Sequence, residues 1–285
     1  MDANVVVLNQ GYDQAFQARE QQLIDQLSAY DDLVISFSGR LESCYCIDLC
    51  RASGVRIRAM IMDTPTRSRS EVSRAIRYCR RYGIDHWIVK TDEMIFCDQL
   101  SQLDEIIDPV RRLCEHRATH PEWATLPFLL PGTAEERAGY IEMFGSIPED
   151  TIWLMADHGF TKRDVRYGFN KRQLDGLGKG GNGCLSHRFA HPSQLQPHHL
   201  RMVDQAEQIL ADMGFDEAQV FFHILCDGRE LTCNSGPTLA RVRLPEHQRA
   251  RAFDMQPDIL QALKGTLFDL VTLDMVPHER HELAI

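Results

Sequence analysis

The clearest fold signal in the chain is residues 33–43, which read Leu-Val-Ile-Ser-Phe-Ser-Gly-Arg-Leu-Glu-Ser. The first five residues are mostly apolar and favour β-structure, so they predict a short buried strand that ends in a tight loop at Ser38-Gly39. A helix is expected to follow from Glu42 and to end at Gly54, because glycine readily adopts the left-handed conformation that closes a helix. This stretch therefore predicts a strand, a loop and a helix in immediate succession.

The same alternation continues toward the C-terminus. Residues 56–62 and 86–89 are predicted strands, and a helix is expected between them, from the possible capping residue Ser68 to Gly83. Strands that alternate with helices at this spacing favour a parallel sheet covered by helices, and such sheets bind ligands at the carboxyl ends of their strands. The predicted fold class is therefore α/β, with a Rossmann-like parallel sheet flanked by helices.

The rest of the chain divides near residue 190. Residues 1–190 are expected to form the first domain and residues 191–285 a smaller α+β domain, since the pattern changes after Pro192. In the first domain, further helices are expected at 12–30 and from 159, a strand at 151–155, and short helices and loops over 94–150. In the second, helices are expected at 200–213 and 256–263, and strands at 218–225, 239–244 and 267–273.

Composition and charge exclude several classes of function. The 285 residues carry 31 Lys and Arg against 41 Asp and Glu, a net charge of -10 that argues against a broad surface for nucleic acid. No apolar run approaches the roughly 18 residues of a membrane span, and the first residues do not resemble a signal peptide. Nine cysteines, an odd number at irregular spacing, argue against a disulfide framework. A cytoplasmic protein with reduced thiols and no membrane partner is predicted.

The loop at residues 36–43 has the composition of an anion site. Ser38, Ser43 and the amide of Gly39 lie where a strand meets the positive end of a helix dipole, and such a position suits phosphate oxygens. Glu42 is placed either to support a metal-bound triphosphate or simply to favour the helix dipole. The Walker spacing is absent, and a Ser/Gly turn after a strand is often no more than a turn.

A set of motifs in sequence order resembles one family. The loop looks like the pyrophosphate loop, Ser-Gly-Gly-Val/Leu-Asp-Ser, of PP-loop ATP pyrophosphatases, and the chain from about residue 15 to 250 resembles their LarE-like sulfurtransferase branch. Residues 63–69, Asp-Thr-Pro-Thr-Arg-Ser-Arg, resemble the segment after the second strand, and residues 131–136, Pro-Gly-Thr-Ala-Glu-Glu, occupy the place of Asp-Gly-Thr-Asn-x-Asp. Residues 179–188, Lys-Gly-Gly-Asn-Gly-Cys-Leu-Ser-His-Arg, look like the block Lys-Pro-x-x-x-Cys-Leu-Ser-Ser-Arg.

The resemblance implies a PP-loop ATPase fold and a two-stage reaction. ATP adenylates a carbonyl oxygen, pyrophosphate leaves, and a sulfur nucleophile then displaces AMP. Mg²⁺ is implied as the metal, with Glu42 as its ligand, and Lys179 and Arg188 are implied as substrate-binding residues. The residues implied in ATP binding are Ser36, Ser38, Gly39, Arg40, Ser43, Asp63, Gly132 and Thr133.

Three departures from the family pattern limit what it implies. Arg40 replaces a loop glycine and Glu42 replaces an aspartate, which puts tight phosphate wrapping and metal binding in doubt. Only Cys114 remains of a Cys-containing segment, so no iron–sulfur cluster is expected. Residues 219–223, Gln-Val-Phe-Phe-His, stand where LarE proteins carry arginines, which favours a less anionic substrate.

Two cysteines are candidates to carry sulfur. A thiolate is needed for this chemistry, and cationic neighbours lower a thiol's pKa. Cys114 lies among Arg111, Arg112, His116 and Arg117, and Cys184 follows the glycine-rich residues 176–183 and precedes His187 and Arg188. Packing is the alternative for each, and composition alone favours a plain flexible loop for the glycine-rich residues. Cys114 is the favoured carrier, with Cys184 as its partner in catalysis.

These observations predict an ATP-dependent, thioamide-forming sulfurtransferase that acts on a small molecule, with a guanine-type purine lactam as the candidate. The sulfur is expected to come from a donor protein such as a cysteine desulfurase-like enzyme, and the resemblance implies a homo-oligomer. The alternatives are a catalytically degenerate, nucleotide-binding regulatory protein, an amidating ligase that uses ammonia, and a tRNA thiolation enzyme. The acidic charge disfavours the last of these.

Overall fold

The computed structural model describes residues 3–95, 107–174, 184–191, 194–225, 236–264 and 267–276, with side chains from residue 11 onward. The chain forms two compact units. The large unit contains Met1–Met62, Val72–Lys90 and Val110–Lys179, and the small unit contains Asp63–Glu71, Thr91–Pro109 and Gly180–Ile285. The small unit thus combines the C-terminal part of the chain with two short earlier segments, whereas the sequence analysis used a single boundary at 190.

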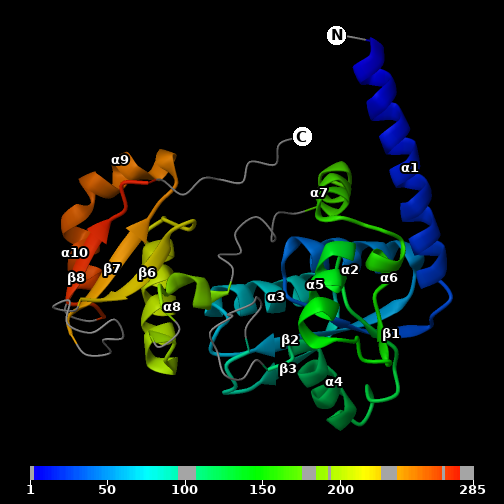
Figure 1. Cartoon of the computed structure of the whole chain (residues 1–285), viewed down its shortest axis with the longest axis horizontal. Coiled ribbons are helices and arrows are strands. Elements are labelled where there is room, and N and C mark those ends of the chain that lie inside the picture. Colours follow the sequence, from blue (N-terminus) through cyan, green and yellow to red (C-terminus); the bar gives the residue numbers. More distant parts are fainter. Residues whose placement is uncertain are drawn as a thin grey trace. The chain divides into compact units, whose positions relative to one another are not determined.

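The large unit is built on a five-stranded sheet in the order β3-β2-β1-β4-β5, flanked by helices (Figure 1). The pairs β1–β2, β1–β4 and β4–β5 are parallel. The strands are β1 (Asp32–Ser36), β2 (Arg56–Asp63), β3 (Asp85–Lys90), β4 (Phe128–Leu129) and β5 (Thr151–Ile152). The predicted α/β fold, a Rossmann-like parallel sheet flanked by helices, is confirmed.

The helices of the large unit follow the expected apolar spacing. In α2 (Leu41–Ser53), Cys46, Leu49 and Cys50 are buried, and the helix ends at Gly54 with φ +80°. Burying one such apolar side chain stabilises the fold by about 1.5–3 kcal/mol, which holds this helix against the sheet. The other helices are α1 (Ala3–Leu27), α3 (Arg69–Arg81), α4 (Pro109–Thr119), α5 (Ala134–Phe144), α6 (Leu154–Asp157) and α7 (Lys162–Lys171).

The strand predicted at 151–155 was wrong beyond residue 152. Asp157 N donates to Trp153 O at 2.9 Å and His158 N to Leu154 O at 3.0 Å, so the chain turns into α6 directly after β5. A short apolar run has no periodicity that separates a strand from a buried helix. The two-residue strand β4 lies in the proline-rich region from which only short helices and loops were expected, and it is the neighbour of β1.

Gly168 of α7 lies directly under the ring of Tyr45. A Cβ at this position would lie 2.6 Å from the ring and its hydroxyl, and that hydroxyl donates to Glu20 Oε1 at 2.7 Å, so the ring is held in place. We expect Gly168→Ala to lower the free energy of unfolding by about 1–3 kcal/mol because the core is overpacked. Gly139→Ala on α5 is the matched control, since nothing lies within 4 Å, and it should stabilise by up to about 1 kcal/mol. Urea unfolding checks both, and equal effects would contradict the packing argument.

The small unit contains a mixed three-stranded sheet in the order β6-β7-β8. β6 (Gln219–Ile224) and β7 (Thr238–Arg243) are antiparallel, and β8 (Leu270–Leu273) is parallel to β7. Alternate residues of β6 and β7, including Val220, Phe222 and Val242, are buried in one core with the apolar faces of the helices. These helices are α8 (Pro197–Asp212), α9 (Glu246–Asp254) and α10 (Gln256–Leu263), and a short 3₁₀-helix, η2, covers Leu185–Arg188. The predicted smaller α+β unit is confirmed.

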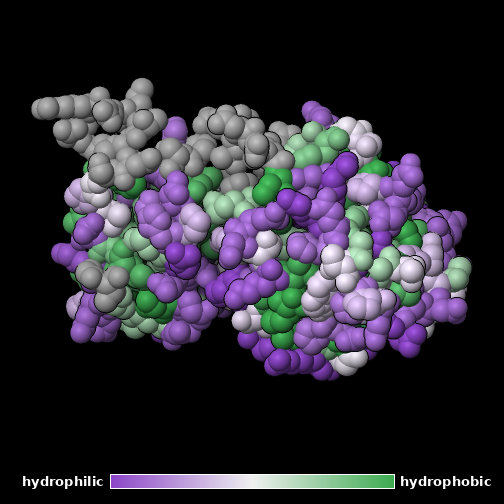
Figure 2. All heavy atoms as spheres, turned by 90° about the horizontal axis from the view of Figure 1, so that it is seen from below, coloured by the Kyte–Doolittle hydropathy of each residue, from purple (hydrophilic) through white to green (hydrophobic). Residues whose placement is uncertain are grey.

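The surface drawn in Figure 2 carries hydrophilic residues over most of its area, and hydrophobic residues gather in smaller patches. Most large apolar side chains of the described residues are buried in the two cores, whereas a few, among them Phe253 and Met275, are exposed. Among the described residues, no helix combines the length and the apolar character that crossing a membrane would require.

Candidate functional site

The order of the strands creates a ligand position beside β1. The chain passes from β1 to β2 and β3 on one side and returns to β4 and β5 on the other, so the direction of the strand order reverses between β1 and β4. In open α/β sheets, ligands bind at such a switch point, outside the carboxyl ends of the strands. Ile35 pairs with Leu129, and Ser38 and Gly132 each lie three residues beyond this pair. Two predicted ATP-binding segments therefore begin at the same edge of the sheet.

The loop between β1 and α2 is held in a defined conformation. Gly39 has φ +74°, a conformation that residues with a side chain rarely adopt, and a Cβ there would lie 3.2 Å from Ala75 Cβ. The hydroxyl oxygens of Ser38 and Ser43 lie 3.0 Å apart, and the Arg40 amide donates to Ser38 Oγ at 3.2 Å. The predicted loop residues are thus brought together in one turn.

This turn leads directly into the first turn of α2. The residue at the N-cap of α2, Arg40, makes no side-chain capping hydrogen bond. The amides that open a helix have no partner within the helix, and they carry the positive end of its dipole. Ser38 is half-buried, and its hydroxyl lies beside these amides. The arrangement can therefore accept phosphate oxygens through backbone amides and serine hydroxyls.

Gly132 and Thr133, which follow β4, have clear structural roles. A Cβ on Gly132 would lie 2.3 Å from the Trp153 ring, so glycine is needed for that ring to pack here. Thr133 caps α5: its hydroxyl accepts from Glu136 N at 3.4 Å, and its own amide donates to Glu136 Oε2 at 2.9 Å. The buried Thr133 side chain is used in this cap, and a ligand at this edge would therefore meet backbone.

Glu136 is a further acidic residue of this edge, and it is not among the predicted site residues. Burial raises its pKa above 4.5, and the nearby carboxylate of Glu42 contributes to the rise. The two carboxylates thus lie close enough to interact, one at the start of α2 and one at the start of α5. Mg²⁺ in nucleotide sites binds one or two carboxylates and completes its shell with phosphates and water. Glu42 and Glu136 are the acidic side chains of this edge from which such ligands could come, and Glu136 Oε2 already accepts from the Thr133 amide. The described residues contain no cluster of three metal-ligating groups.

Cys114 is half-buried on α4. Arg117 of the same helix donates to buried carbonyl oxygens, among them Ala124 O at 2.9 Å and Leu126 O at 2.6 Å, and it also pairs with Asp150. Arg112 forms an ion pair with Glu115 at 2.7 Å. The buried guanidinium of Arg117 thus stabilises the loop after α4 through these bonds, and the basic environment of Cys114 stays a prediction.

Cys184 is fully buried in the small unit, at the start of η2. Ser186 Oγ lies 3.0 Å from its sulfur, which in turn lies 3.6 Å from Thr66 O. A hydroxyl that donates to sulfur favours the thiolate, whereas burial favours the thiol. Cys184 thus has one polar group suited to its predicted role, but it needs a path to solvent before it can exchange sulfur.

The thiols of the described residues should react in a clear order. Burial raises the pKa of Cys44 to about 12, with Cys79 and Glu42 adding to the effect, and burial raises the pKa of Cys79 to about 12. Since the thiolate is the nucleophile, both should resist iodoacetamide at pH 8, while the half-buried Cys114 is alkylated. Peptide mass mapping of the native and the urea-unfolded protein checks this order. Labelling of Cys44 before Cys114 in the native protein would contradict it.

The other predicted site residues include Arg188 and Asp63, both assigned to the small unit. Arg188 is buried, and its Nε donates to Glu207 Oε1 at 2.7 Å, so its charge is balanced inside the small unit. Asp63 ends β2, and its carboxylate pairs with Arg69. Lys179 and the glycine-rich residues 176–183 lie outside the described residues. The structure thus brings together the Ser36–Ser43 loop and the segment after β4, but it gives Arg188 a structural partner.

No protein-family model matches the chain, and no curated protein sequence matches it. Among solved structures, the chain is similar to NMN synthetase from Francisella tularensis. The identity is 14%, the TM-score is 0.41, and the match covers 56% of this chain and 71% of that chain.

Proposed function

We propose that the protein is an ATP-dependent sulfurtransferase of the PP-loop type, which forms pyrophosphate and AMP. The observation that carries the proposal is the loop from Ser36 to Ser43, which joins the central parallel strand to the uncapped start of α2 at the switch point of the sheet. Its Gly39 conformation and its paired serine hydroxyls suit a bound pyrophosphate group. Arg40 adds a positive charge at the same turn.

Each group near the loop has a part in this proposal. The amides of the first turn of α2, with Ser38 and Ser43, would hold the phosphates that leave as pyrophosphate, and Glu42 and Glu136 would hold Mg²⁺. Bound Mg²⁺ would neutralise charge that develops on the leaving group. The carbonyl oxygen of the substrate attacks the α-phosphorus of ATP, and the bond from this phosphorus to pyrophosphate breaks. The outer sulfur of a cysteine persulfide then attacks the activated carbon, and AMP leaves. A second thiol breaks the remaining S–S bond, which releases the thiocarbonyl product and leaves a disulfide that an external thiol reduces.

The proposed substrate is a small lactam, with a guanine-type purine as the first candidate. A lactam carbonyl oxygen can be adenylated and then exchanged for sulfur, which gives a thioamide. The proposed carrier is Cys114, because its half-buried thiol is open to a protein donor of persulfide sulfur, whereas Cys184 is buried. Cys184 is proposed as the second cysteine of the reaction, and its sulfur accepts a hydrogen bond from Ser186 Oγ.

The test is a reaction of the purified protein with Mg-ATP, a persulfide donor and a panel of lactams that includes guanine. Pyrophosphate release is measured together with the mass of a thiolated product. We expect both, and the product should require the sulfur donor. Product formation with ammonia alone would identify an amidating ligase instead, and ATP binding without pyrophosphate or product would identify a nucleotide-binding regulatory protein.

A further inference from the structure

The exposed face of α3 carries an arginine stripe, which consists of Arg74, Arg77, Arg80 and Arg81. The last three are exposed and Arg74 is half-buried, whereas the one acidic residue of the helix, Glu71, is buried. Residues three or four apart lie side by side on a helix, and like charges at this spacing destabilise it. Arg80 and Arg81 also complement the dipole at the helix C-terminus. Helix stability therefore gives no reason for Arg74 and Arg77.

The stripe keeps its charge in a chain that is rich in carboxylates. The sequence carries 41 Asp and Glu against 31 Lys and Arg, and several arginines elsewhere in the large unit have acidic partners. Arg172, for example, binds Glu20 at 2.8 Å and Asp48 at 2.9 Å. Neither Arg77 nor Arg80 forms an ion pair with a carboxylate of the described residues. These two guanidiniums are thus available to carboxylates of another molecule.

Arg51 of α2 extends the positive surface at the end of α3. Its guanidinium lies 4.5 Å from the centre of the Tyr82 ring, and that of Arg81 lies 5.5 Å from the same ring. The ring centres of Tyr82 and Tyr78 lie 4.6 Å apart. Contacts of this kind restrict the two arginine side chains, which lowers the entropy that binding costs. They also occupy the Tyr82 ring, so it is unsuited to stacking on a nucleic-acid base.

We propose that the arginine stripe, together with Arg51, binds an acidic helical segment of a partner protein. Guanidinium groups bind carboxylates through two parallel hydrogen bonds, and these charge-assisted bonds are stronger than bonds between neutral groups. Side chains three and four residues apart on a helix are about 5–6 Å from each other. Asp and Glu at this spacing on the partner therefore match the spacing of the stripe. This inference goes beyond the proposed function, because it concerns neither ATP nor the sulfur acceptor.

The charge of the chain favours a protein partner over a nucleic acid. Protein sites for nucleic acid can contact about 6–10 phosphates, whereas the stripe and Arg51 provide five cations. The net charge of -10 also repels a long polyanion beyond the stripe. A short acidic segment meets only the stripe, so the rest of the surface opposes it less.

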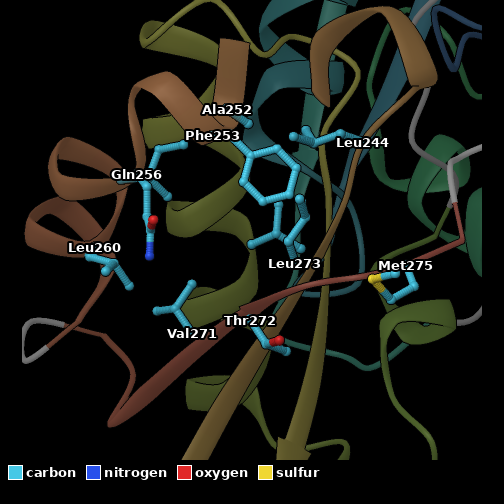
Figure 3. Close-up of a pocket in the computed structure, with 11 residues that line it drawn as sticks. Leu244, Ala252, Phe253, Gln256, Leu260, Val271, Thr272, Leu273 and Met275 are labelled. Atoms are coloured by element: carbon cyan, nitrogen blue, oxygen red, sulfur yellow. The ribbon is translucent and has the colours of Figure 1, made fainter. Parts of the chain in front are cut away.

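The shape of the surface likewise favours a protein over a small anion. Sites for small molecules are concave and bury most of the ligand, whereas the stripe lies on an exposed helix face. The small unit does contain a hollow of about 320 Å³ (Figure 3). Phe253, Leu273 and Met275 are among its lining residues, most of which are apolar, so it is unsuited to an anion. An acidic ligand is therefore expected on the surface of α3.

Binding of a labelled model peptide to the full chain tests the proposal. The peptide is an alanine-rich helix of about 16 residues, with glutamates three and four residues apart on one face. Fluorescence anisotropy should show saturable binding that weakens as salt rises from about 50 to 200 mM, because surface charges are screened. The same peptide with glutamine at those positions should not bind. Arg77→Glu should raise the Kd of the acidic peptide about tenfold or more, since an attractive pair becomes a repulsive one.

Arg166→Glu on α7 is the matched control, because it changes the charge of another exposed arginine of the large unit by the same amount. It should alter the Kd by less than about threefold. Arg80→Glu should weaken binding as Arg77→Glu does, which preserves the test if one variant is unstable, and urea unfolding confirms that the variants are folded. Equal weakening by Arg77→Glu and Arg166→Glu would mean that net charge alone governs binding, and the stripe would not be the site.

A short RNA with as many charges as the peptide separates the two classes of partner. Tighter binding of the RNA than of the peptide would identify a nucleic-acid site and overturn the proposal, as would the absence of saturable peptide binding. None of these measurements involves ATP turnover, so they succeed or fail independently of the proposed sulfurtransferase activity.

Discussion

Gly39→Val should reduce ATP-dependent pyrophosphate release about 100-fold or more. The substitution forces a β-branched residue into a backbone with φ +74°, where a Cβ would also press on Ala75. The loop can relieve this strain only by moving the amides and hydroxyls that are proposed to hold the phosphates. A displacement of about 1 Å in a positioned site can cost 100-fold in rate. The rate of pyrophosphate release with saturating Mg-ATP measures the effect.

The control for this variant lies at the other end of the same helix. Gly54 also has a positive φ, +80°, but nothing lies within 4 Å of a Cβ there. Gly54→Val therefore imposes a similar backbone strain on α2 without disturbing the loop after β1. We expect it to lower stability and to retain pyrophosphate release below its melting temperature. If both variants lose activity equally at that temperature, the loss reflects helix stability and the loop is not the phosphate site.

Cys114→Ser should abolish the thiolated product while pyrophosphate release continues. The hydroxyl keeps the approximate size of the side chain, but it cannot carry a persulfide. The adenylation step uses the loop after β1, so it should proceed without the thiol, and the activated substrate should then hydrolyse. Product mass and pyrophosphate are measured in the same reaction, which separates the two stages.

Two further variants identify the role of the thiol. Cys79→Ser, at a buried thiol in the core of the large unit, should preserve sulfur transfer in the fraction of protein that folds. Cys184→Ser should also reduce thiolated product if the buried cysteine acts with Cys114. Wild-type product formation by Cys114→Ser would remove Cys114 from the mechanism. The proposed carrier would then be Cys184, and peptide mapping of added sulfur after incubation with the donor would decide it.

Much of the fold is visible in local patterns. The run at residues 33–37, the apolar face of the following helix and its terminal Gly54 predicted β1, α2 and the turn between them, because each depends on residues close in sequence. The strands of the small unit also appear as short β-rich runs. Two elements near the site, β4 and α6, could not be predicted from local patterns. β4 has only two residues, and α6 follows β5 without a polar break, so neither has a period long enough to recognise.

In the candidate site too, some features follow from local sequence and others depend on tertiary contacts. The Ser38-Gly39 turn and its place before a helix follow from local sequence, because strand, glycine and helix start are contiguous. The closeness of Glu136 to Glu42 depends on β4 lying beside β1, and no local pattern contains that pairing. The bonds of Arg117 to loop carbonyls and to Asp150 likewise join residues that no local pattern brings together. Local sequence thus specifies which chemical groups the chain carries and the turn that presents some of them. Which groups meet and which charges are neutralised depend on contacts between distant residues, since these contacts exist only after the sheets have assembled.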